Sequence, residues 1–337
     1  MLIQNQSLKN LNTFGVEAKA KLFAEVISED ELVKLLSDGN LKLEKKFILG
    51  SGSNILFTKD FDGIIIKVSI SGINVIEEND KSVWIEAGAG VIWNDLVKYC
   101  VEKNFGGIEN LTLIPGTVGA APIQNIGAYG QELADIFISL NGVFVETCEQ
   151  KTFSKIECKF SYRSSIFKKE LKNEFIISSV RLKLSKSSKA NTSYKALSDY
   201  LSKKRMANPT INDVSTAVAE IRRSKLPDPA KIGNAGSFFK NPVINENSFR
   251  SLKAEYPDIV SFFSDSGQIK ISAGWLIEKC GWKGKRVGDV GTSPDHALII
   301  CNFGNATGAE ILEFAMRIKE DVAKKFGIKL EEEVNIL

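Results

Sequence analysis

His296 is the only histidine of the chain, and this limits the acid–base chemistry that the sequence can support. A single imidazole disfavours a Ser-His-Asp hydrolase, a histidine-rich metal site and an HExxH protease. The cysteines form no CxxC pair, so a zinc site is not expected either. Any acid–base chemistry must therefore rely mainly on carboxylates, hydroxyls, lysine or a cofactor.

A glycine-rich turn, Gly50-Ser51-Gly52-Ser53-Asn54, lies between two apolar stretches at residues 47–49 and 55–57. A Rossmann fingerprint would need a third glycine where Ile55 stands and a helix after it, so this turn is of another type. Consecutive amide groups in a glycine turn form a concave anion site, so the turn could hold phosphates. A simple hairpin turn is the alternative.

The stretch 114–130, IPGTVGAAPIQNIGAYG, contains four glycines, two prolines and no charged residue. An α-helix tolerates neither so much glycine nor so much proline, and a solvated loop would normally carry charge. We therefore expect ordered, irregular backbone packed against a large and partly apolar ligand, because glycine lets the main chain approach closely. The alternative is a tight loop inside a domain interface.

The overall composition places these segments in an ordinary soluble globular protein. The 337 residues suggest two or three domains, with 43% hydrophobic and 25% charged residues. A net charge of +3 is too balanced for a dedicated nucleic-acid binder, but it leaves room for a basic pocket. Five cysteines, an odd number, indicate reduced thiols in the cytoplasm, and we find neither a signal peptide nor an apolar run of membrane-spanning length.

Apolar periodicity predicts the elements that must position these segments. Strands are expected near residues 23–27, 47–49, 55–57, 63–70, 82–90, 136–145, 175–184 and 297–300. Helices are expected after Ser28, over 92–106, over 212–223, around 275–277, and from a capping box at Thr307 to Gly327, with Gly39 ending the first of them. Residues 185–207 are rich in serine and lysine and predict a loop and short helix covering a site, or else a solvated linker.

Several motifs together resemble the UDP-N-acetylenolpyruvoylglucosamine reductase family over essentially the full length. These motifs are Asn12-Thr13-Phe14-Gly15, the turn 50–54, the stretch 114–130, residues 162–167 (YRSSIF), 225–229 (KLPDP), 233–242 (GNAGSFFKNP) and 330–334 (LEEEV). The Tyr194-bearing insert is similar to that of the type I members. The resemblance implies that NADPH reduces FAD, that hydride reaches C3 of the enolpyruvyl group of the substrate, and that C2 is then protonated.

The resemblance also implies three catalytic residues. Ser237 matches the proton donor, although a serine in a glycine turn is usually a turn residue. Arg163 matches the arginine that pairs with the enolpyruvyl carboxylate, a contact that guanidinium can make through two hydrogen bonds; a surface ion pair is the alternative. Glu333 matches the glutamate that polarises or protonates that carboxylate, although the run 331–333 could equally be a solvated acidic tail.

Four further residues match substrate contacts. Tyr194, Lys225 and Asn241 are candidates for the diphosphate, because they supply charge and donors. His296 falls at a polar substrate contact of the family, and a structural histidine at the start of a strand is the alternative. Arg222 and Arg223 are additional candidates for the diphosphate.

FAD is implied along the turn 50–54 and the stretch 114–130, with Tyr129 near the ring system. The predicted cofactor residues are Gly50, Ser51, Gly52, Ser53, Asn54, Pro115, Gly116, Gly119, Ala120, Asn125, Ile126, Gly127 and Tyr129. Gly119 and Ile126 are expected to supply backbone contacts. These loops contain neither histidine nor cysteine, so we predict that FAD is bound non-covalently.

Two departures from the family pattern bear on this site. Asn335 stands where most members carry an arginine, which predicts a less firmly held final strand and a less firmly held Glu333. Ala120 and Ala121 stand where relatives often place serines, and the missing hydroxyls could change the affinity for flavin.

The predicted fold is α+β, with a two-part FAD-binding domain of the PCMH/vanillyl-alcohol-oxidase-like type and a C-terminal α+β substrate-binding domain. The expected boundaries are 1–70 and 71–215 for the two FAD-binding parts and 216–337 for the substrate domain. We expect a cytoplasmic monomer that uses FAD and NADPH on a UDP-sugar, without a metal, a nucleic acid or a membrane as partner. Alternatives are an FAD-dependent alcohol oxidase on the same cradle and a catalytically silent flavin- or nucleotide-binding protein.

Overall fold

The computed structural model describes residues 1–187, 190–263 and 269–337, and it divides into two compact units. Unit 1 consists of Met1–Gln6, Ala20–Ser51 and Asp62–Ser224, and unit 2 consists of Ser7–Lys19, Gly52–Phe61 and Lys225–Leu337. The second unit is thus assembled from three separate stretches of chain. Its last stretch begins at the predicted junction Lys225-Leu226-Pro227-Asp228-Pro229, where proline cannot continue the preceding helix.

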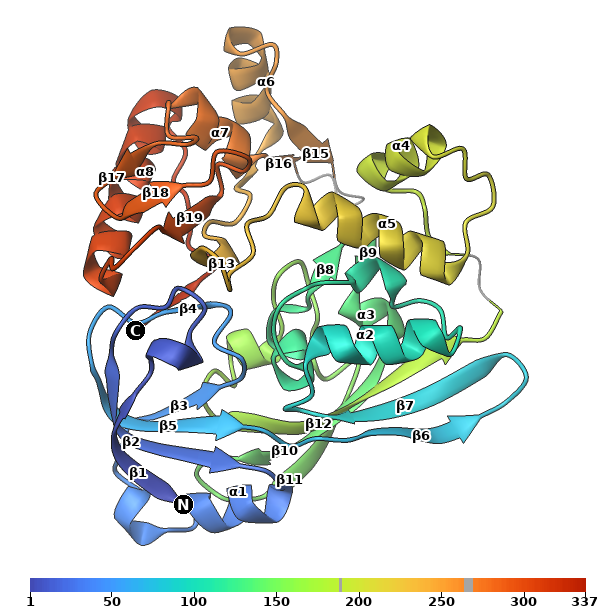
Figure 1. Ribbon diagram of the computed structural model, residues 1–337, viewed down its shortest axis with the longest axis vertical. Helices are drawn as coiled ribbons and strands as arrows, with labels where there is room; N and C mark the ends of the chain where they lie inside the picture. Colours follow the sequence, from blue (N-terminus) through green and yellow to red (C-terminus); the bar gives the residue numbers. More distant parts are fainter. Residues whose placement is uncertain (188–189, 264–268) are drawn as a thin grey trace. The chain divides into compact units, whose positions relative to one another are not determined.

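The described residues of unit 1 form two larger sheets and a two-stranded one (Figure 1). The four-stranded sheet has the order β1-β2-β5-β3, from strands β1 (Leu2–Ser7), β2 (Lys19–Val26), β3 (Lys46–Leu49) and β5 (Phe61–Val68). The five-stranded sheet has the order β11-β10-β12-β7-β6, from β6 (Ile73–Glu78), β7 (Ser82–Gly88), β10 (Phe137–Phe144), β11 (Gln150–Ser154) and β12 (Phe175–Ser185). A short hairpin pairs β8 (Gly127–Ala128) with β9 (Gln131–Glu132).

One hydrophobic core joins both sheets of unit 1 to its helices. The helices are α1 (Glu29–Leu36), α2 (Trp93–Glu102), α3 (Leu133–Ile136), α4 (Lys195–Lys203) and α5 (Ile211–Arg223). The largest side chain of this core is Trp93, which is fully buried and donates its indole N–H to the carbonyl of Leu111 at 3.0 Å. A smaller cluster lies between α4 and α5, where Leu197, Leu201 and Val214 are buried.

Over its described residues, unit 2 combines three small sheets with three helices. Its strands are β4 (Ile55–Leu56), β13 (Gly233–Ser237), β14 (Val243–Ile244), β15 (Ser261–Phe263), β16 (Ile269–Ile271), β17 (Arg286–Val287), β18 (Val290–Thr292), β19 (Ile299–Asn302) and β20 (Asn335–Ile336). The sheet orders are β13-β19-β18-β17, β14-β16-β15 and β20-β4, and the helices are α6 (Glu246–Glu255), α7 (Ala273–Lys279) and α8 (Gly308–Phe326). The mixture of helices and mainly antiparallel sheets in both units confirms the predicted α+β class.

Most predicted helix ends are confirmed because they rest on local capping chemistry. Thr307 caps α8 with Glu310 as its capping-box partner, and Gly327 ends the helix in the left-handed conformation at φ 67°. The prediction that Gly39 ends the first helix is wrong. That helix ends at Leu36 with Ser37 as its C-cap, and Gly39 instead begins a short 3₁₀ turn, Gly39–Leu41.

Two of the alternatives left open by the sequence are excluded. The turn 50–54 is no hairpin, because β3 pairs with β5 whereas β4 pairs with β20, both in parallel. The insert 185–207 is more than a solvated linker, because α4 buries Leu197 and Leu201 against α5. Residues 188–189 of that insert lie outside the described residues.

Each of the five cysteines has a free thiol, and burial raises the pKa of Cys100, Cys158 and Cys301 to about 12. At neutral pH these three are therefore uncharged apolar side chains of the core. Across the described ranges, no helix has both the length and the apolar character that would let it cross a membrane.

Candidate active site

The uncharged stretch 114–130 is held against the end of β7 by its own backbone. Val118 donates to the carbonyl of Val91 and Gly119 to that of Ala89, each at 2.9 Å. A Cβ on Gly119 would lie 2.5 Å from the Cβ of Ala89, so only glycine permits this approach. The following residues Val118–Gln124 form a 3₁₀ helix containing Pro122, which gives regular structure to part of a stretch expected to be irregular.

Along the stretch 114–130, buried residues alternate with exposed, uncharged residues. Thr117 and Val118 are buried, whereas Pro115 and Ala120 are exposed. Of the two alanines that replace serines in related sequences, Ala121 is buried, so only position 120 could present a hydroxyl to a ligand. The amides of Gly119 and Ile126 are already bonded inside the protein and are not left for a ligand.

Two asparagines fix the far end of the loop. Asn125 is buried and left-handed, at φ 44°, and its side chain bonds Glu132 at 2.7 Å and the amide of Ala134 at 3.0 Å. Asn110 donates to the carbonyl of Tyr129 at 2.8 Å, and Tyr129 is itself left-handed, at φ 50°. The part-buried bond from Asn110 helps to hold Tyr129 in a conformation that non-glycine residues rarely adopt.

Arg163 lies in a tight turn that is tied to the same loop. Ser161 and Ser164 exchange backbone hydrogen bonds of 3.0 and 3.1 Å, which leaves Tyr162 and Arg163 at the tip. Arg163 has φ 52°, and the hydroxyl of Ser165 donates to the carbonyl of Ile123 at 2.8 Å. The motif 162–167 and the stretch 114–130 are therefore one structural assembly within unit 1.

Tyr194 packs against the far end of the stretch 114–130. Its ring meets that of Tyr129 edge to face, with the centroids 5.4 Å apart. Asn191 of the same insert donates to the carbonyl of Gly130 at 3.1 Å. Unit 1 thus brings together Arg163, Tyr129 and Tyr194, which the sequence had proposed separately.

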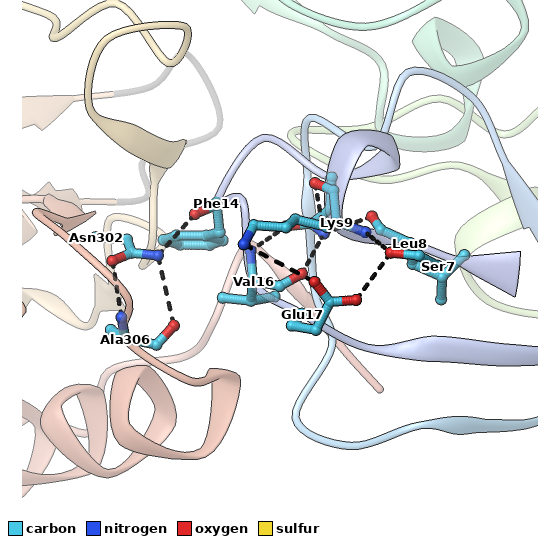
Figure 2. Close-up of polar contacts among 9 residues, drawn as sticks. Ser7, Leu8, Lys9, Phe14, Val16, Glu17, Asn302 and Ala306 are labelled. Atoms are coloured by element: carbon cyan, nitrogen blue, oxygen red, sulfur yellow. Dashed lines mark hydrogen bonds and ion pairs between the residues drawn. The ribbon is translucent and has the colours of Figure 1, made fainter.

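In unit 2 the motif Asn12-Thr13-Phe14-Gly15 connects the glycine turn to β13. Thr13 donates its amide to the carbonyl of Gly52 at 3.1 Å and accepts from the amide of Asn234 at 3.0 Å. Figure 2 shows the anchor beside it, where the side-chain amide of Asn302 donates to the carbonyl of Phe14 at 3.0 Å. A Cβ at Gly52, which has φ 69°, would lie 1.9 Å from the carbonyl oxygen of Leu11.

Ser237 is presented by an irregularity at the end of β13. The register between β13 and β19 shifts between Asn234 and Ser237, and Gly236 adopts φ 71° there. The side chain of Asn234, which the sequence analysis did not single out, accepts from the amide of Gly236 at 3.0 Å and donates to the carbonyl of Ile232 at 2.9 Å. A bulge of this kind re-aims the side chain that follows it, here a half-buried serine.

Glu333 is brought to the strand of Ser237 by an antiparallel bridge. Its amide donates to the carbonyl of Phe238 at 2.8 Å, and Phe239 pairs with Glu332. The other two glutamates of the run form ion pairs, Glu331 with Lys240 at 3.0 Å and Glu332 with Lys319 at 2.5 Å. The alternative of a solvated acidic tail is therefore wrong, and the three glutamates have three different environments.

The structure shows which bonds hold the final strand, which was expected to be less firmly held with Asn335. The amide and the side-chain amide of Asn335 both donate to the carbonyl of Asn54, at 3.1 and 3.0 Å. Two more backbone bonds join Leu337 to Leu56 and to Thr58, at 2.9 and 2.7 Å. Asparagine thus anchors this strand without the arginine that related sequences carry.

The remaining predicted substrate contacts all lie in unit 2. Asn241 accepts from the amide of Ala273 at 2.9 Å, just after the N-cap of α7, so its carbonyl oxygen is already used. His296 precedes β19 and has a buried Nδ1 for which the described residues offer no hydrogen-bond partner. Burial, followed by the positive charges of Lys225 and Lys283, lowers the pKa of His296 and keeps it neutral at pH 7.

Comparison with known proteins covers both ends of the chain. Residues 20–149 match the family described as FAD binding domain, and residues 228–337 match the family described as UDP-N-acetylenolpyruvoylglucosamine reductase, C-terminal domain. Curated relatives named UDP-N-acetylenolpyruvoylglucosamine reductase include those of Flavobacterium johnsoniae, 50% identical over 99% of this chain and 98% of the relative, and Amoebophilus asiaticus, 47% identical over 100% and 99%.

A solved structure agrees with the predicted fold. The UDP-N-acetylenolpyruvylglucosamine reductase of Thermus caldophilus aligns over 100% of this chain and 98% of its own, with a TM-score of 0.68 at 24% identity. Together with the FAD-binding match, this confirms the PCMH-like fold class. Because full-length relatives reach half identity, the chain belongs to the UDP-N-acetylenolpyruvoylglucosamine reductase family.

Proposed function

We propose that this protein catalyses the NADPH-dependent reduction of UDP-N-acetylglucosamine enolpyruvate to UDP-N-acetylmuramate, a step of peptidoglycan synthesis, with FAD as its cofactor. The structural observation that supports it most directly is the backbone hydrogen bond from Glu333 to Phe238. This bond places the proposed catalytic glutamate next to the strand that carries Ser237, the proposed proton donor. Membership in the reductase family supplies the substrate class. An alcohol oxidase would have no use for Ser237, Arg163 and Glu333 together.

The residues of the loop and the turn fit a non-covalent FAD. Within the described chain, the amides of Gly50 and Gly52 have no hydrogen-bond acceptor, as expected for donors to a diphosphate. A Cβ on Gly50 would lie 2.7 Å from the hydroxyl of Thr117, so a larger residue there would force that side chain to shift. The outward-facing Pro115 and Ala120 offer an uncharged surface for a planar ring. When bound, FAD supplies the transfer of hydride from NADPH to C3 of the enolpyruvyl group.

Arg163 binds and orients the enolpyruvyl carboxylate in this proposal. Its backbone lies in the left-handed region at the tip of a short turn that is closed by the bridge between Ser161 and Ser164. A fixed guanidinium can hold a carboxylate through two parallel hydrogen bonds, which sets the distance of the neighbouring carbon to its reaction partner. The same positive charge stabilises the negative charge that develops next to this carboxylate.

Ser237 then gives its proton to C2, and Glu333 acts on the carboxylate. A serine hydroxyl is a weak acid, but an enolate-like carbon is basic enough to accept its proton when solvent is excluded and the geometry is fixed. The shifted register at Gly236 provides this fixed geometry. Glu333, protonated or hydrogen-bonded to the substrate carboxylate, spreads the charge of the enolate-like state.

Tyr194, Lys225, Asn241 and His296 complete the substrate site as contacts to the sugar nucleotide. Lys225 supplies the charge, and the other three supply neutral hydrogen-bonding groups. We retain the parts 1–70, 71–215 and 216–337 only as a proposed division by role, FAD binding and substrate binding; it differs from the two compact units, the second of which also includes residues 7–19 and 52–61. The protein is proposed to act as a cytoplasmic monomer, and reduced thiols support this location.

An anaerobic titration tests the function directly. NADPH is added first to the FAD-containing protein, and bleaching of the flavin absorbance is expected. Addition of UDP-N-acetylglucosamine enolpyruvate should then restore the absorbance in a stoichiometric step. A flavin that bleaches but is re-oxidised only by oxygen would favour an oxidase-type enzyme, and a flavin that never bleaches would exclude the proposed reaction.

A further inference from the structure

Asn110 is a buried asparagine whose side chain joins separate segments of unit 1. It lies in a short 3₁₀ turn and is only 1% exposed. Its side-chain amide donates to the carbonyl of Tyr129 and to the carbonyl of Asn191, each at 2.8 Å. An asparagine amide has two hydrogens to donate, so these two bonds use both of them. The stretch 114–130 and the insert 185–207 therefore meet at one buried side chain.

The bond to Asn191 helps to fix the turn that leads to Tyr194. Asn191 donates its own side-chain amide to the carbonyl of Gly130 at 3.1 Å. Its side-chain oxygen accepts from the amide and from the hydroxyl of Ser193, at 3.1 and 2.7 Å. Since Ser193 immediately precedes Tyr194, the backbone on this side of the tyrosine is held by Asn110 through Asn191.

Tyr194 lies between this polar anchor and an apolar one. The residue is 41% exposed, so packing around its side chain holds it only in part. Its ring meets that of Tyr129 edge to face, and the carbonyl of Tyr129 is the other acceptor of Asn110. On the far side of Tyr194, α4 is packed against α5 through the buried Leu197 and Leu201. Asn110 is the buried residue of the polar anchor.

We propose that Asn110 is a positioning residue for the sugar nucleotide and that it acts through Tyr194. This inference rests on the proposed function, in which Tyr194 contacts the diphosphate of the substrate. A residue that is 1% exposed does not reach a ligand, so Asn110 affects binding by holding Tyr194 in place before the substrate arrives. Without this hold, substrate binding has to order the segment before Tyr194, and part of the affinity is lost.

The test compares Asn110→Leu with the matched control Thr112→Val in the FAD-containing protein. Leucine has a similar volume to asparagine and donates no hydrogen bond. Thr112 is a buried residue at the end of the same turn, and its hydroxyl bonds the carbonyl of Glu109 at 2.6 Å and the hydroxyl of Ser215 at 2.8 Å. Both variants therefore remove buried hydrogen bonds of one turn, but only the first removes the bonds to the stretch 114–130 and to the insert.

Dissociation constants for UDP-N-acetylglucosamine enolpyruvate are measured from perturbation of the flavin spectrum. Asn110→Leu should weaken binding about 10-fold, the effect of one or two ordinary hydrogen bonds, with full FAD content. Thr112→Val should stay within about 2-fold of wild type, because Tyr194 keeps its anchor. An unchanged dissociation constant in Asn110→Leu, or equal losses in the two variants, overturns the inference.

A double-mutant cycle shows whether Asn110 acts through Tyr194. Tyr194→Ala should weaken binding by itself, and the addition of Asn110→Leu should weaken it by no more than about a further 2-fold, because the residue that Asn110 positions is already gone. A merely structural asparagine would give two independent losses that multiply, and this result refutes the proposed role. If Tyr194→Ala binds like wild type, the assignment of Tyr194 to the substrate fails and the inference fails with it.

Asn191→Ala reaches the same anchor from the insert, and it decides the question if Asn110→Leu loses FAD or does not fold. Asn191 is half-buried, and its replacement removes the bonds to Gly130 and Ser193. Binding should weaken about 3- to 10-fold in the wild-type background and by no more than about 2-fold beside Tyr194→Ala. Wild-type affinity in Asn191→Ala overturns the inference. A wild-type protein that does not bind the compound overturns the proposed function as well, whereas failure of the inference alone leaves wild-type binding intact.

Discussion

Ser237 shows how the local backbone can prepare a weak acid for one proton transfer. The left-handed Gly236 and the buried Asn234 fix the turn before it, and the bridge to Glu333 fixes the residue after it. Hydrogen bonds thus hold the backbone on both sides of Ser237, so little reorganisation is needed when its hydroxyl gives up the proton. A water molecule would have to be ordered from bulk solvent for the same task.

Ser237→Ala should separate the two half-reactions. Reduction of the flavin by NADPH is expected to stay within about 2-fold of wild type, whereas turnover of the sugar nucleotide should fall by about 10² to 10⁴, the usual contribution of a positioned proton donor. Stopped-flow absorbance of the flavin measures both steps separately. Equal loss in both would indicate that Ser237 is structural, and Asn234→Ala serves as the control for damage to the turn.

His296 should make the fold less stable as the pH falls. Its pKa in the folded protein is lowered, chiefly by burial, so the unfolded chain binds the proton more readily and stability is lost as the pH falls below about 6.5. His296→Gln removes this effect. Between about pH 7.5 and about pH 5, the wild-type free energy of unfolding should decrease more than that of the variant, by at most about 1.4 kcal/mol per pH unit.

Urea unfolding of the FAD-containing protein without substrate measures this difference. The carboxylates titrate identically in both proteins, so they cancel in the comparison. Parallel pH dependences of wild type and His296→Gln would show that the imidazole pKa is not lowered by its surroundings.

Among the elements, one of the two-residue strands has a role larger than its length suggests. β20 is two residues long, yet it pairs with β4 from a segment about 280 positions earlier, and only Val334 separates it from Glu333. The side-chain amide of Asn54 also donates to the carbonyl of Glu333 at 3.2 Å. The turn proposed to bind FAD and the proposed catalytic glutamate are therefore joined by backbone and side-chain bonds within unit 2.

Removal of strand β20 should reduce activity more than removal of the Asn335 side chain alone. Asn335→Ala deletes one bond to Asn54 and is expected to destabilise the protein by about 0.5–1.5 kcal/mol with nearly normal turnover. Deletion of residues 335–337 deletes the pairing with β4 as well, and kcat should fall because Glu333 is no longer held. Denaturant unfolding and steady-state rates measure the two effects, and normal kcat after the deletion would contradict this view of the strand.

The elements also show which parts of such a fold can be predicted from sequence. The capping residues Thr307 and Gly327 gave the ends of α8 correctly, because capping depends on neighbours three or four residues away. The partner of β4 could not be found in this way, since nothing near Ile55 or Asn335 encodes their pairing. For the same reason the sequence suggested that Asn335 leaves the strand loose, although its carbonyl partner is supplied by Asn54.

In the candidate site, too, local motifs identify some residues, whereas others can be distinguished only by how distant parts of the chain pack. Motif resemblance located Ser237, Arg163 and Glu333, and their proposed roles stay predictions. Arg222 was one of two adjacent arginines with equal standing in the sequence. Arg222 is half-buried with its Nε enclosed, whereas Arg223 is exposed; this difference depends on how α5 packs, so tertiary information is needed to distinguish them.

At the scale of the whole molecule, unit 2 is not a continuous C-terminal domain. The segments Ser7–Lys19 and Gly52–Phe61 belong to it, although the match to the reductase C-terminal family begins only at residue 228. The ring of Phe14 packs against that of Phe238, with the centroids 6.3 Å apart. A Cβ added to Gly308 would lie only 1.8 Å from the carbonyl oxygen of Phe57, so the backbone of the early segment touches this helix. The early segments therefore fill positions in the interior of this unit.

A fragment of residues 225–337 should consequently fail to fold on its own. It lacks β4, the buried side chains Phe14, Leu56 and Phe57, and the carbonyl groups that Asn302 and Asn335 bond. Burial of each such side chain contributes about 1.5–3 kcal/mol, so the three alone approach the net stability of about 5–15 kcal/mol that a domain possesses. Near-ultraviolet circular dichroism and denaturant titration should show no cooperative transition, whereas the full chain unfolds cooperatively. A fragment with native-like spectra and a sharp transition would mean that the segments before residue 62 are dispensable for this unit.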